Sequence, residues 1–321
     1  MFNARRLTAA ATAGILAATF MVNTRVAATA SSDEAEPGIY SRTLADLNVA
    51  LAARGSRNVR IDRAEISVTA AGWQGATTIY ANDRTHQVES LFVARDPRRG
   101  GFPDISYLVD KSDGSALALQ GPGVIVLSNA VTEPRIDASM ARWQNAPSCP
   151  GPAVTKLADD GTDPDLVDGL IFGDASQIGT PRADITHAGW LPAAFFDALA
   201  PQGSEFILGV TFTFIFTDDD GNPTDLDHNG RSDTAFREIY YNRAFPWSET
   251  AARPGIHIES VVTHEAGHAF GLAHFGKVFE DQNGTLKFAP RAVMNAVYVS
   301  PFAELTGTDN ASFCQIWAPR K

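Results

Sequence analysis

The chain has 321 residues, of which 44% are hydrophobic, and its formal net charge at pH 7 is −11. This length provides one large domain or two modest ones with a buried core, and the apolar share is too high for a chain that is disordered throughout. The acidic balance argues against nucleic acid as a partner, because the phosphate backbone attracts basic surfaces.

The first thirty residues are typical of an export signal. Arg5 and Arg6 precede an apolar, alanine-rich run over residues 7–22, and small residues follow as far as Ala30. This order predicts a signal peptide over residues 1–30 and a secreted protein, extracellular or periplasmic. A membrane anchor is the alternative, but the run is short for a membrane span, so no membrane contact is expected after the signal is removed.

Residues 31–100 are predicted to contain one short helix and several strands. The apolar spacing predicts the helix over 41–55, and residues 59–73 and 77–83 have the composition of strands. Arginine, glycine and proline crowd residues 95–104, which predicts a domain boundary there. The region is expected to be a removable propeptide or a permanent accessory region, and the sequence leaves both open.

Beyond residue 100, strands and helices follow one another without a regular alternation. Strands are predicted at 105–110, 206–216 and 238–242, and helices at 132–146 and 305–318. Such an irregular order predicts the α+β class for a domain over residues 101–321.

The chain has only two cysteines, Cys149 and Cys314. In an exported protein, two such cysteines often form one disulfide. Sequence does not give their separation, so a disulfide and two free thiols both remain open.

Residues 264–274 read HEAGHAFGLAH and contain three of the seven histidines. His264 and His268 are four residues apart, so on a helix both imidazoles lie on one face and reach one cation. Gly271 can adopt the left-handed conformation that ends a helix, and the resulting turn brings His274 back as a third ligand. Three neutral imidazoles suit zinc and leave its fourth position open. Incidental histidines on a buried helix are the alternative, but that alternative does not account for the spacing.

Glu265 follows the first ligand directly and is placed to reach a water on the metal. Zinc lowers the pKa of such a water toward neutrality and polarises the scissile carbonyl. A carboxylate beside it can accept the proton and later pass it to the leaving amine. The residues therefore predict hydrolysis through a zinc-activated water with Glu265 as the general base.

HEAGHAFGLAH fits HExxHxxGxxH, and on this motif the chain resembles the metzincin zinc metallopeptidases. That family has a methionine turn beneath the zinc, which Met294 in RAVMNAVY matches. The chain is most similar to the matrixins, since Tyr298 matches their tyrosine, whereas Ala296 replaces their proline. The resemblance covers residues 100–321 and implies a metzincin-like domain: a twisted mixed β-sheet, an active-site helix and a Met-turn.

The resemblance also implies a protein or peptide substrate. In metzincins a substrate lies extended along the edge strand above the zinc, held by main-chain hydrogen bonds. The resemblance places Ile239, Tyr240 and Tyr241 in that edge strand and Tyr298 beside the scissile bond, although an internal strand at 238–242 is the alternative. A monomer is expected.

Besides Ala296, the chain departs from the matrixin pattern in three ways. Phe275 follows the third ligand, where the known subgroups usually place other residues. No second set of histidines is present for their structural zinc. The stretch at 97–104 resembles their propeptide motif but lacks its cysteine, so latency through a cysteine is not expected.

An acidic loop over residues 217–233 predicts a calcium site. Asp225, Asp227, Asn229 and Asp233 lie at alternating or near-alternating positions, as the oxygen ligands of a calcium loop do. No glutamate occupies the twelfth position, so the loop is not a complete EF-hand, and a solvated acidic turn is the alternative.

The predicted function is that of a secreted zinc-dependent endopeptidase. One alternative is a secreted, calcium-braced binding protein with a catalytically silent zinc site, against which the presence of Glu265 argues. Another is a zinc hydrolase of a non-peptide substrate, which only an assay distinguishes.

Overall fold

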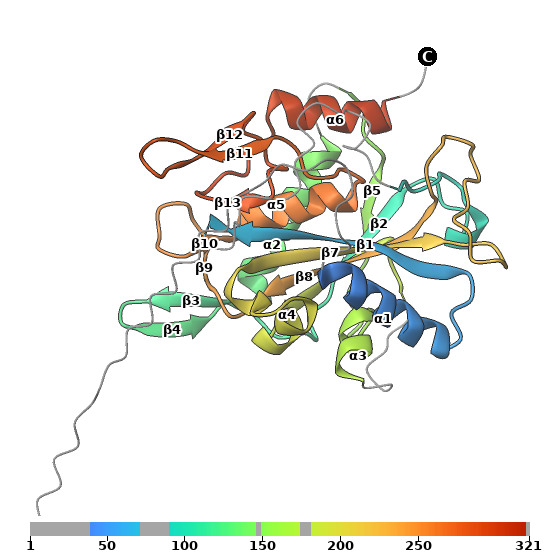
Figure 1. The fold of residues 1–321 in the computed structure, drawn as a ribbon, viewed down its shortest axis with the longest axis horizontal. Coiled ribbons are helices and arrows are strands. Elements are labelled where there is room, and N and C mark those ends of the chain that lie inside the picture. The colour runs from blue at the N-terminus through green and yellow to red at the C-terminus, as the bar shows by residue number, and fades with distance from the viewer. Residues whose placement is uncertain (1–38, 71–89, 146–148, 174–180, 319–321) are drawn as a thin grey trace, which may run out of the picture. The chain divides into compact units, whose positions relative to one another are not determined.

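The computed structural model describes residues 39–70, 90–145, 149–173 and 181–318 (Figure 1). The predicted signal peptide and the strand predicted at 77–83 lie outside these residues.

A seven-stranded mixed sheet organises the described chain, in the order β13-β1-β7-β8-β6-β2-β5. The antiparallel pairs are β1 with β7 and β7 with β8, and the other neighbours are parallel. The strands are β1 Val59–Thr69, β2 Ile105–Val109, β5 Val154–Lys156, β6 Ile185–Leu191, β7 Ile207–Phe216, β8 Thr234–Asn242 and β13 Val297–Tyr298. A second sheet has four strands in the order β10-β9-β3-β4: β3 Leu117–Gln120, β4 Gly123–Val126, β9 Pro246–Ser248 and β10 Ile256–His257. A third sheet pairs β11 Lys277–Glu280 with β12 Leu286–Ala289.

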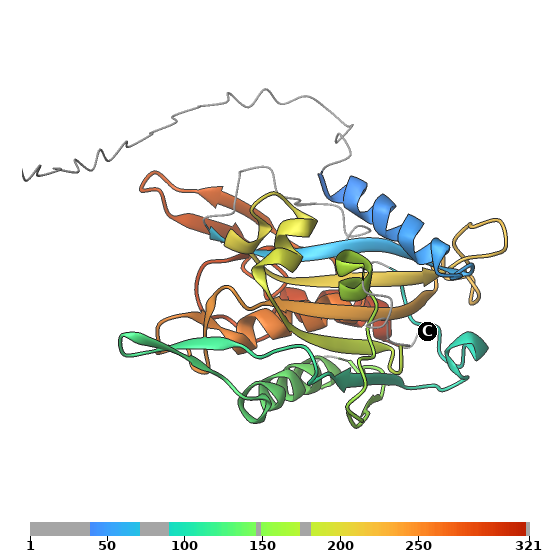
Figure 2. The same ribbon diagram turned by 90° about the horizontal axis from the view of Figure 1, so that it is seen from below.

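Helices cover both faces of the large sheet (Figure 2). The helices are α1 Ile39–Ala53, α2 Asn129–Gln144, α3 Val167–Phe172, α4 Ala193–Leu199, α5 Ile258–Ala269 and α6 Gly307–Trp317, with short 3-10 helices η3 Pro97–Arg99 and η4 Gly203–Glu205. Two apolar cores result, one beneath α1, α3 and α4 and one between the sheet and α2, α5 and α6. Because both faces are covered, all ten residues of β7 are buried.

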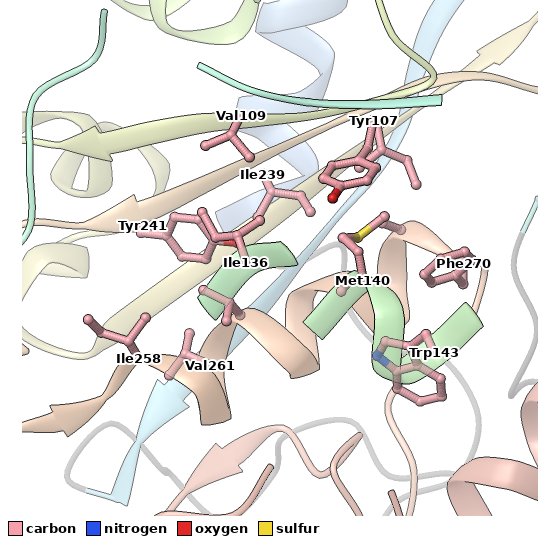
Figure 3. Close-up of a cluster of buried hydrophobic side chains, with 14 of the residues drawn as sticks. Tyr107, Val109, Ile136, Met140, Trp143, Ile239, Tyr241, Ile258, Val261 and Phe270 are labelled. Carbon is pink, nitrogen blue, oxygen red and sulfur yellow. The ribbon is translucent and has the colours of Figure 1, made fainter. Parts of the chain in front are cut away.

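The second of these cores holds the helix that carries the histidines. Side chains from three layers meet there, as Figure 3 shows: Tyr107, Ile239 and Tyr241 from strands, Ile136, Met140 and Trp143 from α2, and Ile258 and Val261 from α5. The indole N–H of Trp143 donates a hydrogen bond to the carbonyl of Thr263 (2.7 Å), which fixes α2 against α5.

The N-terminal strand β1 is part of the large sheet. It pairs with β7 from Val59 opposite Phe216 to Val68 opposite Ile207, and its last two residues also pair with β13. Residues 37–321 form one compact unit. The breakers at 95–104, which predicted a domain boundary, instead form a tight turn around η3, where Gly100 has φ +83°.

Cys149 and Cys314 form a disulfide, with Cα atoms 5.6 Å apart and 165 residues between them in sequence. The bond ties the segment after α2 to α6. Among the described residues, no helix combines the length and the apolar character that a membrane crossing needs.

Candidate metal centre

Helix α5 is buried on nearly all sides, which holds its side chains in fixed positions. Met294 and Trp143 pack closely against α5 because position 267 is a glycine. A Cβ there would lie 2.2 Å from Sδ of Met294 and 2.8 Å from Cζ2 of Trp143. Met294 is 1% exposed and therefore packs directly against the helix between its two histidines. Any larger residue at 267 would push α5 away from this support.

The helix ends where the sequence predicts a sharp turn. Gly271 has φ +91°, a left-handed conformation that favours glycine. Its N–H donates to the carbonyl of His268 (2.8 Å), and the N–H of Leu272 donates to that of Gly267 (3.1 Å). The chain reverses here and brings His274 toward the helix.

The three histidines converge on one point. The Nε2 atom of His268 lies 3.1 Å from that of His264 and 3.2 Å from that of His274, and the last two are 3.2 Å apart. The Nδ1 atoms of His264 and His268 each lie 2.7 Å from a backbone carbonyl, of Val293 and of Leu272. Because Nδ1 donates to a carbonyl, the lone pair of each Nε2 faces the shared point.

This arrangement fits zinc. Two nitrogens on one tetrahedral zinc lie roughly 3.3 Å apart, close to the distances between these Nε2 atoms. Burial lowers the pKa of His264 to about 3, and the neighbouring His268 adds to the effect. The pKa of His274 is lowered for the same reasons. Neutral imidazoles are the form that binds a metal, and three of them leave a tetrahedral site with one open position.

The third ligand has a partner that the sequence did not predict. Nδ1 of His274 lies 3.4 Å from Oε2 of Glu65 on β1. A carboxylate behind a metal-binding histidine fixes the ring and raises its basicity. No local signal marks Glu65, because β1 and the histidine segment meet only through the fold.

Replacing Glu65 by glutamine is therefore expected to lower zinc affinity by about 10- to 100-fold while the chain stays folded. Competition with a metal chelator of known affinity measures the change. Arg60→Gln, on the same strand with a side chain that is 43% exposed, is the control and is expected to bind zinc as the wild type does. Equal affinity of the Glu65 and Arg60 variants would show that the carboxylate does not support His274.

Glu265 is held by two hydroxyl groups from neighbouring strands. Oγ of Ser67 on β1 donates to Oε1 (2.6 Å), and Oγ1 of Thr211 on β7 donates to Oε2 (2.7 Å). Gly209 leaves room for this carboxylate, since a Cβ there would lie 2.8 Å from Oε1. Burial raises the pKa of Glu265, and His268 and the two hydroxyls act in the opposite direction. A raised pKa brings a carboxylate closer to the range useful for a general base near neutral pH.

The centre is covered by protein. His264 is 4% exposed, His274 is 6% exposed, and Glu265 and His268 are fully buried. A cavity of about 40 Å³ adjoins it, lined by His264, Ser67 and Tyr298 among others. The hydroxyl of Tyr298 accepts a hydrogen bond from the N–H of His257 (3.1 Å).

The segment that carries Met294 is anchored by helix α6. The carboxylate of Asp309 accepts hydrogen bonds from the N–H groups of Val293 (3.0 Å) and Met294 (3.2 Å). Asp309 also forms a capping box with Thr306, the residue that caps α6. The position of Met294 beneath the histidines thus depends on Asp309 in the N-terminal cap of α6.

The edge position predicted for residues 238–242 is wrong. Strand β8 is hydrogen-bonded to β7 on one side and β6 on the other. Ile239, Tyr240 and Tyr241 are fully buried, so they cannot contact a substrate in this fold. The strand beside Glu265 is β7, whose Thr211 contacts this carboxylate. Strand β1 pairs with β7 on the side away from β8.

The acidic loop brings three of its four predicted ligands together. Carboxylate oxygens of Asp225, Asp227 and Asp233 lie within 4.8 Å of one another. However, Asp233 accepts a hydrogen bond from Arg98 (2.6 Å), and the carboxylate of Asp225 accepts from two N–H groups of its own loop. The side-chain oxygen of Asn229, the fourth, accepts from the N–H of Arg231 (2.8 Å). The loop is partly neutralised by Arg98, and calcium there stays a prediction.

Comparison with known proteins adds little. No protein-family model and no curated protein matches the chain. Among solved structures, a chain of the "GM1 bound form of the ECX AB5 holotoxin" is similar over 74% of this chain and 76% of that one, at 12% identity and a TM-score of 0.28. At that TM-score the likeness carries no argument about fold or function.

Proposed function

We propose that this chain is a secreted zinc-dependent endopeptidase with a metzincin-like catalytic domain of the α+β class. The observation that carries the proposal is the convergence of three imidazoles, at 3.1–3.2 Å between their Nε2 atoms, beside the carboxylate of Glu265. The disulfide supports export, because such bonds persist in oxidising compartments.

His264, His268 and His274 would hold the zinc. When bound, the metal acts as a Lewis acid on the scissile carbonyl and acidifies water. Glu265 accepts the proton of the attacking water and passes it to the leaving amine. Thr211 orients this carboxylate, Ser67 holds it as long as the end of β1 is in place, and Met294 supports the helix that carries it.

An extended peptide substrate can pair with β7 only along the edge of that strand that faces away from β8. The end of β1 occupies this edge. We propose that residues 67–69 move aside when an extended peptide binds, so that the peptide pairs with β7 in their place. The earlier part of the N-terminal region is retained in this proposal, because Leu47, Leu51 and Ile61 belong to a buried core. The loop around Tyr298 would then line the substrate site.

The test is hydrolysis of an unfolded protein by the full chain, with its zinc content measured in parallel. One equivalent of zinc and peptide-bond cleavage that stops on chelation and returns with added zinc are the expected results. Stoichiometric zinc without cleavage of any peptide would contradict the proposal.

The burial of the centre favours a second candidate, a binding protein whose zinc site is silent. Glu265 is fully buried and both of its oxygens accept hydrogen bonds from protein hydroxyls. If β1 never moves, the zinc is structural and the protein binds metal without hydrolysing peptides. The same assay separates the two candidates.

A further inference from the structure

A second group of carboxylates lies apart from the zinc centre and the acidic loop. Asp110 and Asp113 follow strand β2, and Asp163 and Asp165 precede helix α3. One carboxylate oxygen from each of the four lies within 4.8 Å of the others. Asp110 is 4% exposed and Asp165 is fully buried, whereas Asp113 and Asp163 are half-buried, so water screens the charges of Asp110 and Asp165 much less than it does at a surface.

The carboxylate of Asp165 has no N–H or hydroxyl donor among the described residues, and the polar groups within its hydrogen-bonding reach are the carboxyl groups of Asp113 and Asp168. Neither of its oxygens accepts a hydrogen bond from such a donor, and Oδ2 of Asp113 and Oδ1 of Asp163 are also unpartnered and buried. No ion pair recorded between described residues involves any of the four. Buried carboxylates are normally paired, protonated or bound to a metal, because an isolated buried charge costs several kcal/mol.

The fold holds these side chains close together. The backbone before α3 is fixed by Glu238 on β8, whose carboxylate accepts from the N–H groups of Leu166 (3.0 Å) and Val167 (3.2 Å). The loop after β2 is fixed against β6, where the N–H of Trp190 donates to the carbonyl of Asp113 (2.8 Å). Gly189 has φ +106°, and a Cβ there would lie 2.4 Å from Cβ of Asp113. The carboxylates therefore cannot relieve their repulsion by moving apart without breaking this packing.

Without a cation, protonation relieves the repulsion among these carboxylates. Burial and the neighbouring Asp168 raise the pKa of Asp163 to about 6, and the pKa of Asp165 is raised by burial and by Glu238 and Asp168. A cation at the centre of the four carboxylates would favour their charged forms instead.

We propose that Asp110, Asp113, Asp163 and Asp165 bind one calcium ion. All four ligands are carboxylates, which suit a hard cation rather than zinc. Oxygens on opposite sides of a calcium ion, each at about 2.4 Å, lie up to about 5 Å apart, so one ion satisfies the observed spacing. The ion would tie the loop after β2 to the segment before α3, and it would supply the positively charged partner that Asp165 lacks.

The test titrates calcium chloride into the full chain after treatment with a chelator, by calorimetry and by thermal unfolding. The wild type is expected to bind calcium and to gain several degrees in melting temperature at saturation. Asp165→Asn is expected to lose at least about tenfold in affinity, because calcium affinity follows the number of ligand charges. With chelator present it should be as stable as the wild type or more so, since it removes a buried charge.

Asp160→Asn is the matched control, because Asp160 lies in the same segment but pairs with Arg182 outside the cluster. An Asp225→Asn/Asp227→Asn double variant removes the other acidic loop and is expected to keep this binding event. If Asp165→Asn fails to fold, Asp113→Asn is measured in the same way. Wild-type calcium affinity in the Asp165 or Asp113 variant, or a melting temperature of the wild type that calcium does not change, would overturn the proposal.

Discussion

Replacing Glu265 by glutamine is expected to lower kcat for peptide hydrolysis by about 10²- to 10⁴-fold while zinc stays bound. Glutamine has nearly the same shape, and its amide oxygen can accept one of the two hydrogen bonds from Ser67 and Thr211, whereas its amide nitrogen cannot accept the other. It cannot take a proton from water. The change therefore removes the chemistry of the base and leaves the three histidines in place.

Initial rates on an unfolded protein and zinc content by elemental analysis check this expectation together. Glu259→Gln is the control, since Glu259 lies on the same helix and pairs with Arg142. We expect this control to keep its activity within a few-fold. If the Glu265 variant cleaves as fast as the wild type, the carboxylate is not the base, and the hydrolysis comes from another group.

Local spacing explains which parts of the centre could be predicted. His264, His268 and Gly271 lie within two helical turns, so helix geometry and one left-handed residue bring His274 close without any other part of the fold. The partners of these residues come from elsewhere. Ser67 donates to Glu265 across 198 residues of sequence. Nothing in the strand pattern of residues 59–69 indicates its pairing with β7.

The wrong edge position of residues 238–242 and the wrong domain boundary at 95–104 have the same origin. The alternation in residues 238–242 is compatible with an edge strand and with an internal one, and only the pairing of β8 with both neighbours decides. At 95–104 the breakers form a tight turn, because Arg98 and Arg99 make ion pairs with Asp233 and Asp184. Both outcomes depend on contacts between segments far apart in sequence.

The carboxylate cluster of Asp110, Asp113, Asp163 and Asp165 could not be found from spacing for a similar reason. Its two halves are about fifty residues apart, and they meet because the loop after β2 is held against β6 and the segment before α3 is held by Glu238 on the neighbouring strand β8. The acidic loop at 217–233 was recognisable because its residues are consecutive. Yet there Arg98 supplies a counter-charge, whereas the cluster holds the fully buried Asp165, which has no N–H or hydroxyl donor among the described residues.

Val68→Asp is expected to raise the rate of peptide hydrolysis by at least about tenfold, since each ~1.4 kcal/mol changes a population ratio tenfold. Val68 is 2% exposed and pairs with Ile207 on one side and Val297 on the other. An unpaired aspartate in this position costs several kcal/mol if the strand end stays in place. Detachment of residues 67–69 places the carboxylate in water and frees the edge of β7.

Two measurements on the same samples make this expectation specific. Zinc should also pass to a chelator faster in the Val68 variant, because β1 covers the metal centre. Val49→Asp is the control, since Val49 lies on α1 and is 71% exposed, and we expect both of its rates to match the wild type. If the Val68 variant stays folded but loses activity, the end of β1 does not detach when a substrate binds and is a fixed part of the site. Residues 67–69 would then act by holding Glu265 through Ser67, and a substrate would have to reach the metal from the side of Tyr298.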